Sequence, residues 1–168
     1  LPDAPLWSVA LPDVASYPII ADGRVFVLVR GNSADAYGTR LFAFNAYTGE
    51  TLWGPMDLSG TYYWSAATYD SGTLYVVNYD GLLRAIAATD GAALWSAHLP
   101  GQYAFTSPPE VSHGPIYVGG AGSGGTVYAV TATNGAMRWT AGQPARTAPP
   151  ISRHGCALHR KAARPIGL

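Results

Sequence analysis

Apolar residues gather in short runs that turn-forming residues separate. Three runs are rich in β-branched and aromatic residues, at positions 25–29, 74–77 and 116–118. A second set alternates apolar with other residues around a small alanine, at Ala43, Ala85 and Ala129. Runs of this length and composition are typical of strands. The pattern predicts an all-β chain with almost no helix.

Glycines mark the turns between these strands. A Thr-Gly, Asp-Gly or Asn-Gly pair ends at Gly49, Gly91 and Gly135, between two apolar stretches. Such pairs favour hairpins, because glycine tolerates the positive φ of a tight turn. Before each alanine strand, another glycine follows a serine by seven residues, in the pairs Ser16 and Gly23, Ser65 and Gly72, and Ser107 and Gly114. The sequence therefore predicts units of four strands joined by hairpins.

Four tryptophans recur at near-equal spacing, since Trp7, Trp53, Trp95 and Trp139 are 46, 42 and 44 residues apart. Alanine precedes each of the last three by ten residues, and glycine precedes each by four. The small alanine leaves room for the tryptophan as a large neighbour. Four-stranded units that repeat every 40-odd residues predict a β-propeller. We expect complete blades at about 16–58, 63–99 and 105–142.

The two ends of the chain do not complete a ring. Residues 6–11 look like the last strand of a blade whose other strands lie elsewhere, and a fourth blade begins near Ala148. The sequence after Gly155 then departs from the repeat and forms an atypical basic tail within 143–168. Three arrangements fit: a fragment of a longer propeller, two chains that close one ring, or a small four-bladed ring. We favour the fragment.

The string Ala-x-Asn-x-x-Thr-Gly-x-x-x-Trp, from Ala43 to Trp53, resembles the tryptophan-docking motif of quinoprotein-type propellers, the pyrroloquinoline-quinone (PQQ)-like repeat. That family usually has Asp where this chain has Asn45, Ala87 and Thr131, and its Thr is replaced at Asp90 and Asn134. The resemblance covers roughly residues 5–142. It implies that the docking positions are Ala43, Gly49, Trp53, Ala85, Gly91, Trp95, Ala129, Gly135 and Trp139.

The resemblance indicates the fold more closely than the function. The family includes quinone-dependent alcohol and sugar dehydrogenases, an assembly factor of outer-membrane barrels, and sensor or scaffold domains. A family dehydrogenase has adjacent cysteines beneath the quinone, a catalytic Asp and a calcium site, whereas Cys156 is the one cysteine here. We therefore expect no catalytic, PQQ or calcium site in this segment. The resemblance favours a non-catalytic, extracytoplasmic binding scaffold. A segment of a dehydrogenase and an extracytoplasmic sensor domain are the alternatives.

The composition and charge of the chain limit the kinds of partner that it can bind. The 168 residues are 48% apolar and 12% charged, and no apolar run approaches the 18 residues of a membrane span. Residues 1–142 carry a net charge of −5, and residues 143–168 carry +5. Five scattered basic residues without interleaved aromatics make a poor site for nucleic acid. We expect a protein partner, the remaining blades of the same propeller, or a second copy.

Two longer connections carry extra aromatic residues. They predict a ligand or partner surface made of Tyr62, Tyr63, Trp64, Tyr103 and Phe105. The alternative is that Tyr63 and Phe105 fill space between blades.

Two other motifs predict no site. Gly120, Gly122 and Gly125 match G-x-G-x-x-G, but they join strand to strand, whereas a dinucleotide site needs a strand and a helix. His154, Cys156 and His159 offer three zinc ligands without a second cluster, so we expect no metal.

Overall fold

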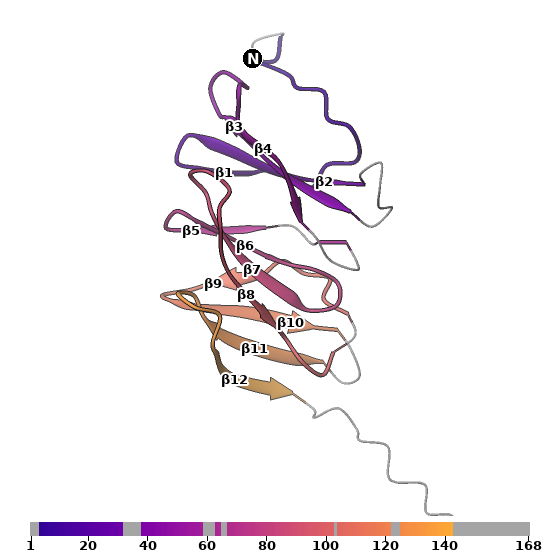
Figure 1. Cartoon of the computed structure of the whole chain (residues 1–168), viewed down its shortest axis with the longest axis vertical. Helices are drawn as coiled ribbons and strands as arrows, with labels where there is room; N and C mark the ends of the chain where they lie inside the picture. Colours follow the sequence, from indigo (N-terminus) through magenta and orange to yellow (C-terminus); the bar gives the residue numbers. More distant parts are fainter. Residues whose placement is uncertain are drawn as a thin grey trace, which may run out of the picture.

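The computed structural model describes residues 4–31, 38–58, 63–64, 67–102, 104–121 and 125–142, and every regular element in these ranges is a strand. Twelve strands form three four-stranded antiparallel sheets (Figure 1). The predicted all-β fold with three complete blades is therefore confirmed. No helix in the described ranges has the length and apolar character needed to cross a bilayer.

Each sheet is one blade, and its strands are adjacent in chain order. Blade 1 contains β1 (Ile19–Ala21), β2 (Arg24–Arg30), β3 (Thr39–Asn45) and β4 (Thr51–Leu58). Blade 2 contains β5 (Thr68–Asp70), β6 (Thr73–Val77), β7 (Leu82–Ala87) and β8 (Ala93–His98). Blade 3 contains β9 (Glu110–Val111), β10 (Pro115–Gly120), β11 (Thr126–Thr131) and β12 (Met137–Gly142).

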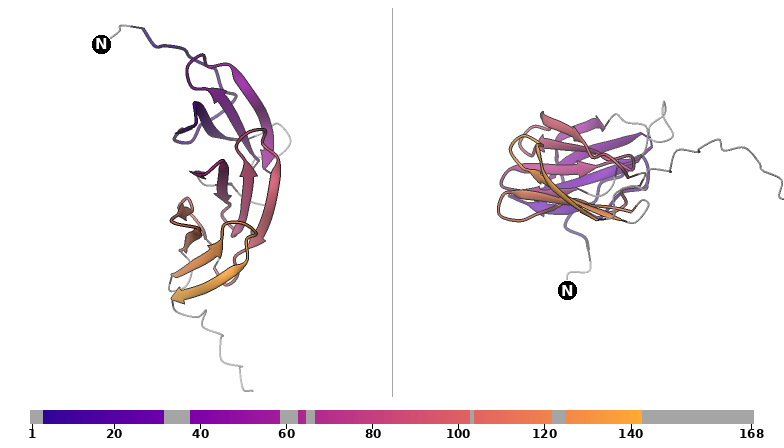
Figure 2. Two further views of the ribbon diagram at one scale, coloured as in Figure 1. Left: turned by 90° about the vertical axis from the view of Figure 1, so that its left-hand side faces the viewer. Right: turned by 90° about the horizontal axis from the view of Figure 1, so that it is seen from below.

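The blades stack in an arc. Figure 2 shows the first strands β1, β5 and β9 on the concave side and the fourth strands β4, β8 and β12 on the convex side. Side chains of blades 1 and 2 share one apolar cluster, and side chains of blades 2 and 3 share a second. The core therefore lies between the sheets, as in a propeller.

An aromatic, an alanine and a tryptophan lie in register across the second, third and fourth strands of every blade. In blade 1, Phe26 pairs with Ala43, and Ala43 pairs with Trp53. The two aromatic rings meet above the alanine with centroids 5.9 Å apart. The equivalent rings are 6.0 Å apart in blades 2 and 3. Alanine suits the middle strand because a larger side chain there would separate the two rings.

Tryptophan also joins one blade to the next. The indole N–H of Trp53 donates to the Ala88 carbonyl oxygen in blade 2 at 3.0 Å, and that of Trp95 donates to the Ala132 carbonyl oxygen in blade 3 at 2.9 Å. Each indole ring also lies against the glycine that follows the accepting alanine by three residues. A Cβ on Gly91 would lie 3.0 Å from the Trp53 ring, and one on Gly135 would lie 2.7 Å from the Trp95 ring.

The turns that receive the tryptophans are built by short polar side chains. The Asn45 side-chain oxygen accepts from the backbone N–H groups of Tyr47 and Thr48 in blade 1. Asp90 accepts from the Ala92 N–H in blade 2, and Asn134 accepts from the Ala136 N–H in blade 3. Asp and Asn side chains favour such local bonds. Thr48 makes the same contact in blade 1, where its hydroxyl oxygen accepts from the Glu50 N–H at 3.3 Å, so the residues that replace the family's Thr keep this turn bond.

The predicted outer strand at residues 6–11 belongs to no sheet of the described chain. Trp7 nevertheless contacts blade 1 as Trp53 contacts blade 2. Its indole N–H donates to the Ala46 carbonyl oxygen at 3.0 Å, and a Cβ on Gly49 would lie 2.7 Å from its ring. One tryptophan therefore occupies the receiving turn of each of the three blades.

Candidate functional site

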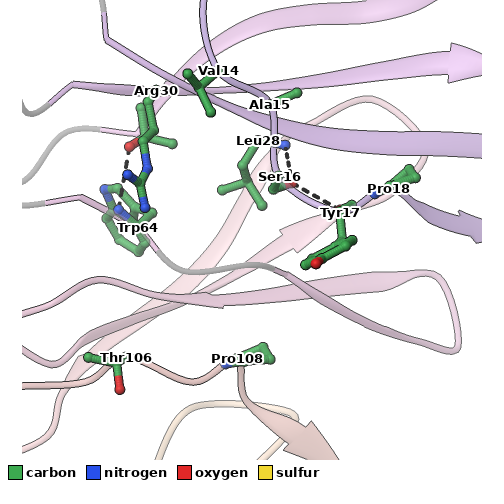
Figure 3. A pocket seen from close by; sticks show the side chains of 11 residues that line it. Val14, Ala15, Ser16, Tyr17, Pro18, Leu28, Arg30, Trp64, Thr106 and Pro108 are labelled. Atoms are coloured by element: carbon green, nitrogen blue, oxygen red, sulfur yellow. Dashed lines mark hydrogen bonds between the residues drawn. The ribbon is translucent and has the colours of Figure 1, made fainter.

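A cavity of about 810 Å³ opens on the inner side of the arc, where parts of all three blades meet (Figure 3). One wall is the segment that leads into β1, with the ends of β2 and β3 beside it. The other wall contains Trp64 and the segment that leads into β9. The cavity is lined by Val14, Ala15, Ser16, Tyr17, Pro18, Leu28, Arg30, Thr39, Trp64, Thr106 and Pro108.

Trp64 is the fixed wall of the cavity. Its side chain is only 4% exposed, its backbone N–H donates to the Thr39 hydroxyl oxygen at 3.4 Å, and its indole N–H donates to the Leu58 carbonyl oxygen at 3.2 Å. A single bridge joins it to Asn78 of blade 2. Trp64 thus contacts blades 1 and 2 at the same time.

Two arginines lie over the aromatic residues of this connection. The Arg84 guanidinium carbon is 5.0 Å from the centroid of the Trp64 ring, and the Arg30 carbon is 5.0 Å from that of Tyr63. Burial lowers the pKa of Arg84, because desolvation disfavours its charged form. Arg30 is exposed at the end of β2 and lines the cavity. Cation–π contacts hold both cations beside the ring faces.

Hydroxyl groups supply the remaining polarity of the cavity. Ser16 accepts from the Leu28 backbone N–H at 3.1 Å and donates to the Tyr17 carbonyl oxygen at 3.0 Å, which fixes the segment before β1. Thr106 is exposed on the opposite wall. No Asp or Glu is among the described residues that line the cavity. This arrangement suits a ligand with an apolar body and an anionic or hydroxyl-bearing group.

Of the five residues of the predicted aromatic surface, the structure describes Tyr63, Trp64 and Phe105. Phe105 is 1% exposed, its ring centroid is 5.7 Å from that of Tyr128, and it packs in the cluster between blades 2 and 3. Tyr63 is half-buried, and Trp64 lines the cavity. Tyr62 and Tyr103 lie outside the described residues. Phe105 therefore has the packing environment of the alternative interpretation, whereas Trp64 faces a space that a ligand can enter.

Arg30 and Arg84 were not predicted as site residues from the sequence. The sequence did contain an indication of Arg84, because Arg84 is the one charged residue in the otherwise apolar β7. A charged residue in a strand of this kind needs a compensating contact. Nothing in the sequence pattern indicated Arg30, because the ring that it contacts, Tyr63, belongs to a connection 33 residues further along the chain.

No described residue of the glycine-rich motif or of the His-Cys-His set lines this cavity. The glycine-rich stretch lies between β10 and β11, with Gly122 outside the described residues. His154, Cys156 and His159 also lie outside them. In the described ranges, no three or more His, Cys, Asp or Glu side chains gather where they could hold a metal ion.

Solved structures with the same fold include enzymes, an assembly factor and designed proteins. The quinohemoprotein alcohol dehydrogenase ADHIIG from Pseudomonas putida HK5 is 22% identical, with a TM-score of 0.57 over 74% of this chain and 20% of the enzyme. BamB from Moraxella catarrhalis is 20% identical, with a TM-score of 0.56 over 77% of this chain and 37% of BamB. The computationally designed Ika4 protein is 16% identical, with a TM-score of 0.61 over 81% of this chain and 78% of Ika4.

These likenesses establish the fold alone, and the chain spans only about a fifth of the alcohol dehydrogenase and over a third of BamB. No curated protein matches the sequence. Residues 38–163 match the family model described as outer membrane protein assembly factor BamB. The matched range includes β3 and β4 of blade 1 and all of blades 2 and 3. The chain therefore belongs to this BamB-type family of PQQ-like repeat β-propellers.

Proposed function

We propose that this propeller segment is a non-catalytic binding scaffold, and that the cavity on its inner side holds the ligand or partner group. The observation that carries the proposal is the composition of the cavity wall. One exposed guanidinium, Arg30, stands beside a buried indole, Trp64, with hydroxyl groups nearby. Such a wall binds an anionic group and an apolar body at the same time.

The lining residues favour binding over chemistry. The Ser16 hydroxyl is engaged with two backbone groups, and no His, Asp or Glu lines the described cavity to act on it as a base. Nucleophilic catalysis needs a nucleophile within reach of such a base. Trp64 is held from two blades, so the wall is formed before a ligand arrives.

A matched pair of dyes tests the proposal. 1-Anilinonaphthalene-8-sulfonate carries a sulfonate, and N-phenyl-1-naphthylamine has a similar apolar body without it. We expect Arg30→Ala to weaken binding of the sulfonate dye by about tenfold, equivalent to about 1.4 kcal/mol. Binding of the neutral dye should stay unchanged.

Arg138→Ala is the control, because Arg138 is exposed on β12, away from the cavity. It removes the same charge and should affect neither dye. Equal loss in the Arg30 and Arg138 variants would indicate non-specific attraction, and the cavity would then have no role in binding.

A second candidate function is that of a segment of a quinone-dependent dehydrogenase. The similarity in fold to the quinohemoprotein alcohol dehydrogenase favours it. Absorbance titration of the chain with PQQ and calcium separates the two candidates. The scaffold predicts no stoichiometric uptake, whereas one PQQ bound per chain would favour the dehydrogenase.

We also propose an extracytoplasmic location. It is supported by the description of the family model, which is an outer membrane assembly factor. Fractionation of cells that produce the full-length protein tests this, since recovery in the cytosolic fraction would contradict it.

A further inference from the structure

One position of the repeat differs between the two blade junctions. The first blade junction lies between blades 1 and 2, and the second lies between blades 2 and 3. Tyr69 in β5 and Val111 in β9 each precede the turn glycine of their hairpin by three residues, and they pair with Leu74 and Ile116. Tyr69 packs against the apolar cluster of the first junction, and Val111 packs against that of the second. The two residues therefore hold equivalent places.

Tyr69 fills the first junction beside the hairpin turns. Its ring stacks on that of Phe26 in blade 1, with the centroids 6.1 Å apart and the planes 14° apart. Its hydroxyl donates to the Asp22 carboxylate of blade 1 and accepts from the Gly72 N–H at 2.9 Å. The hydrogen bond to Asp22 raises the pKa of Tyr69, because it favours the protonated phenol. A phenol ring thus bridges the two blades through one stack and two hydrogen bonds.

The second junction has a cavity of about 540 Å³ beside the corresponding turns. This volume is within the range of small-molecule sites. Val111 carries neither a ring nor a hydroxyl group to fill it. Tyr75 and Trp95 line the cavity, and their positions in the strand register match those of Phe26 and Trp53 at the first junction. The aromatic wall is therefore repeated, with a cavity where the first junction holds a phenol ring.

The polar groups around the phenol hydroxyl are repeated as well. Ser71 is the counterpart of Asp22, since each directly precedes a turn glycine and their φ angles are 47° and 48°. The Ser71 hydroxyl donates to the Asp70 carboxylate at 3.3 Å, which leaves its own oxygen able to accept. Gly114 of blade 3 is the counterpart of Gly72. Ser71, Asp70 and Gly114 all line the cavity.

We propose that the cavity at the second junction binds a phenol group. The ring stacks on Tyr75 beside Trp95, and the hydroxyl donates to Ser71 or Asp70. An aromatic wall favours a flat ring, and acceptors at one end favour a ring with a donor over a plain hydrocarbon. A free phenolic molecule and a tyrosine side chain of a partner present the same group. This site shares no lining residue with the inner cavity, so it does not depend on the function proposed for that cavity.

Fluorine NMR of the full chain labelled with 5-fluorotryptophan tests the proposal, with the resonances assigned from single tryptophan-to-phenylalanine variants. The probes are p-cresol and toluene, which differ only in the hydroxyl group. Saturating p-cresol should shift the Trp95 resonance and leave that of Trp53, its counterpart at the filled junction, unchanged. The dissociation constant of p-cresol should be about tenfold below that of toluene, as one hydrogen bond to a polar or charged acceptor provides.

Three outcomes of this titration would overturn the proposal. Equal dissociation constants for the two probes would show that the hydroxyl is not recognised. Shifts of the same size at Trp53 and Trp95 would indicate general attraction to apolar surface. A shift at Trp64 without one at Trp95 would place the probe in the inner cavity.

Val111→Tyr supplies the side chain that fills the first junction. It should abolish the response of Trp95 to p-cresol. Ile20→Tyr is the matched control, because Ile20 is the equivalent residue of blade 1 and is 71% exposed. That variant should bind p-cresol as the wild type does. A folded Val111→Tyr with unchanged binding would contradict the assignment.

Ser71→Asp keeps the test valid if Val111→Tyr folds poorly. It restores the acceptor found at Asp22, at a φ that Asp22 already adopts. The charged acceptor should lower the dissociation constant of p-cresol about threefold or more and leave that of toluene unchanged. No change for p-cresol would contradict the predicted place of the hydroxyl.

N-acetyl-L-tyrosinamide distinguishes the two sources of the phenol. Tighter binding than that of p-cresol would support a tyrosine side chain of a partner, because the added backbone groups then contribute. Weaker binding would support a free phenolic molecule. N-acetyl-L-phenylalaninamide is the control, and binding as tight as that of the tyrosine derivative would count against any phenol site.

Discussion

The contact between Trp95 and the turn of blade 3 allows a quantitative test of the blade junction through Gly135→Ala. A Cβ at this position would lie 2.7 and 2.9 Å from two atoms of the Trp95 ring and 3.1 Å from the Cβ of Ala97. The ring cannot easily withdraw, because Tyr75 lies on its own blade with the ring centroids 6.0 Å apart. The added methyl group must therefore displace the indole from its turn.

Two terms contribute to the expected loss of stability. Gly135 has φ +72°, and an L-residue in this region costs about 1 kcal/mol. Overpacking a filled site costs about 1–3 kcal/mol, which includes the case in which the indole N–H loses the Ala132 carbonyl. The sum for Gly135→Ala is about 2–4 kcal/mol.

Gly72→Ala is the matched control. Gly72 has φ +83°, and an added Cβ would meet nothing within 4 Å. It therefore carries the conformational cost of about 1 kcal/mol without the clash. Urea unfolding followed by circular dichroism measures both variants, with the slope of the transition checked for constancy. The difference between them, about 1–3 kcal/mol, isolates the indole contact. Equal losses would show that the turn glycine is required for its φ alone, and the docking argument would fail.

Two other predictions concern the buried aromatic residues. Ala85→Leu should lower the free energy of unfolding by about 2 kcal/mol, because Ala85 is fully buried in register between Tyr75 and Trp95. The same change at exposed Ala92 should lower it little, and thermal melts of the two variants measure the difference. Burial also raises the pKa of the Tyr128 hydroxyl, so the folded chain holds this proton more tightly than the unfolded chain. Its contribution to stability is thus complete below about pH 10 and is lost as pH rises through the folded pKa. Urea midpoints should fall above pH 10, with a smaller pH dependence in Tyr128→Phe; an unchanged dependence would contradict the assignment.

The blades could be predicted from the sequence because each is a local structure. The run predicted at 25–29 lies within β2, and the hairpin glycines Gly23 and Gly72 have positive φ as a tight turn requires. Ala43, whose small side chain was expected to leave room for a tryptophan, pairs with Trp53. Hairpin pairing joins residues close in the chain, so period and turn type are enough to predict it.

The partners of the tryptophans across blades could not be read in the same way. The carbonyl that receives Trp53 is 35 residues further on, at Ala88. A backbone carbonyl has no sequence signature, so only the recurring glycine pointed to this contact. The cavity could be predicted even less, because Arg30 on β2 and Tyr63 in the connection between blades 1 and 2 meet only in the folded chain and at no repeat offset.

The cavity and the first blade junction depend on the same residues. Trp64 lines the cavity, but its indole N–H is bonded to Leu58 in blade 1 and its backbone forms a bridge with Asn78 in blade 2. Any change in the angle between these blades moves this wall relative to Arg30 on β2. In repeat proteins each unit contacts only its neighbours, so strain at one junction stays local. The first junction therefore sets the distance between Trp64 and Arg30, whereas the second junction, where Trp95 docks, acts on the cavity only through Thr106 and Pro108 in the segment that leads into β9.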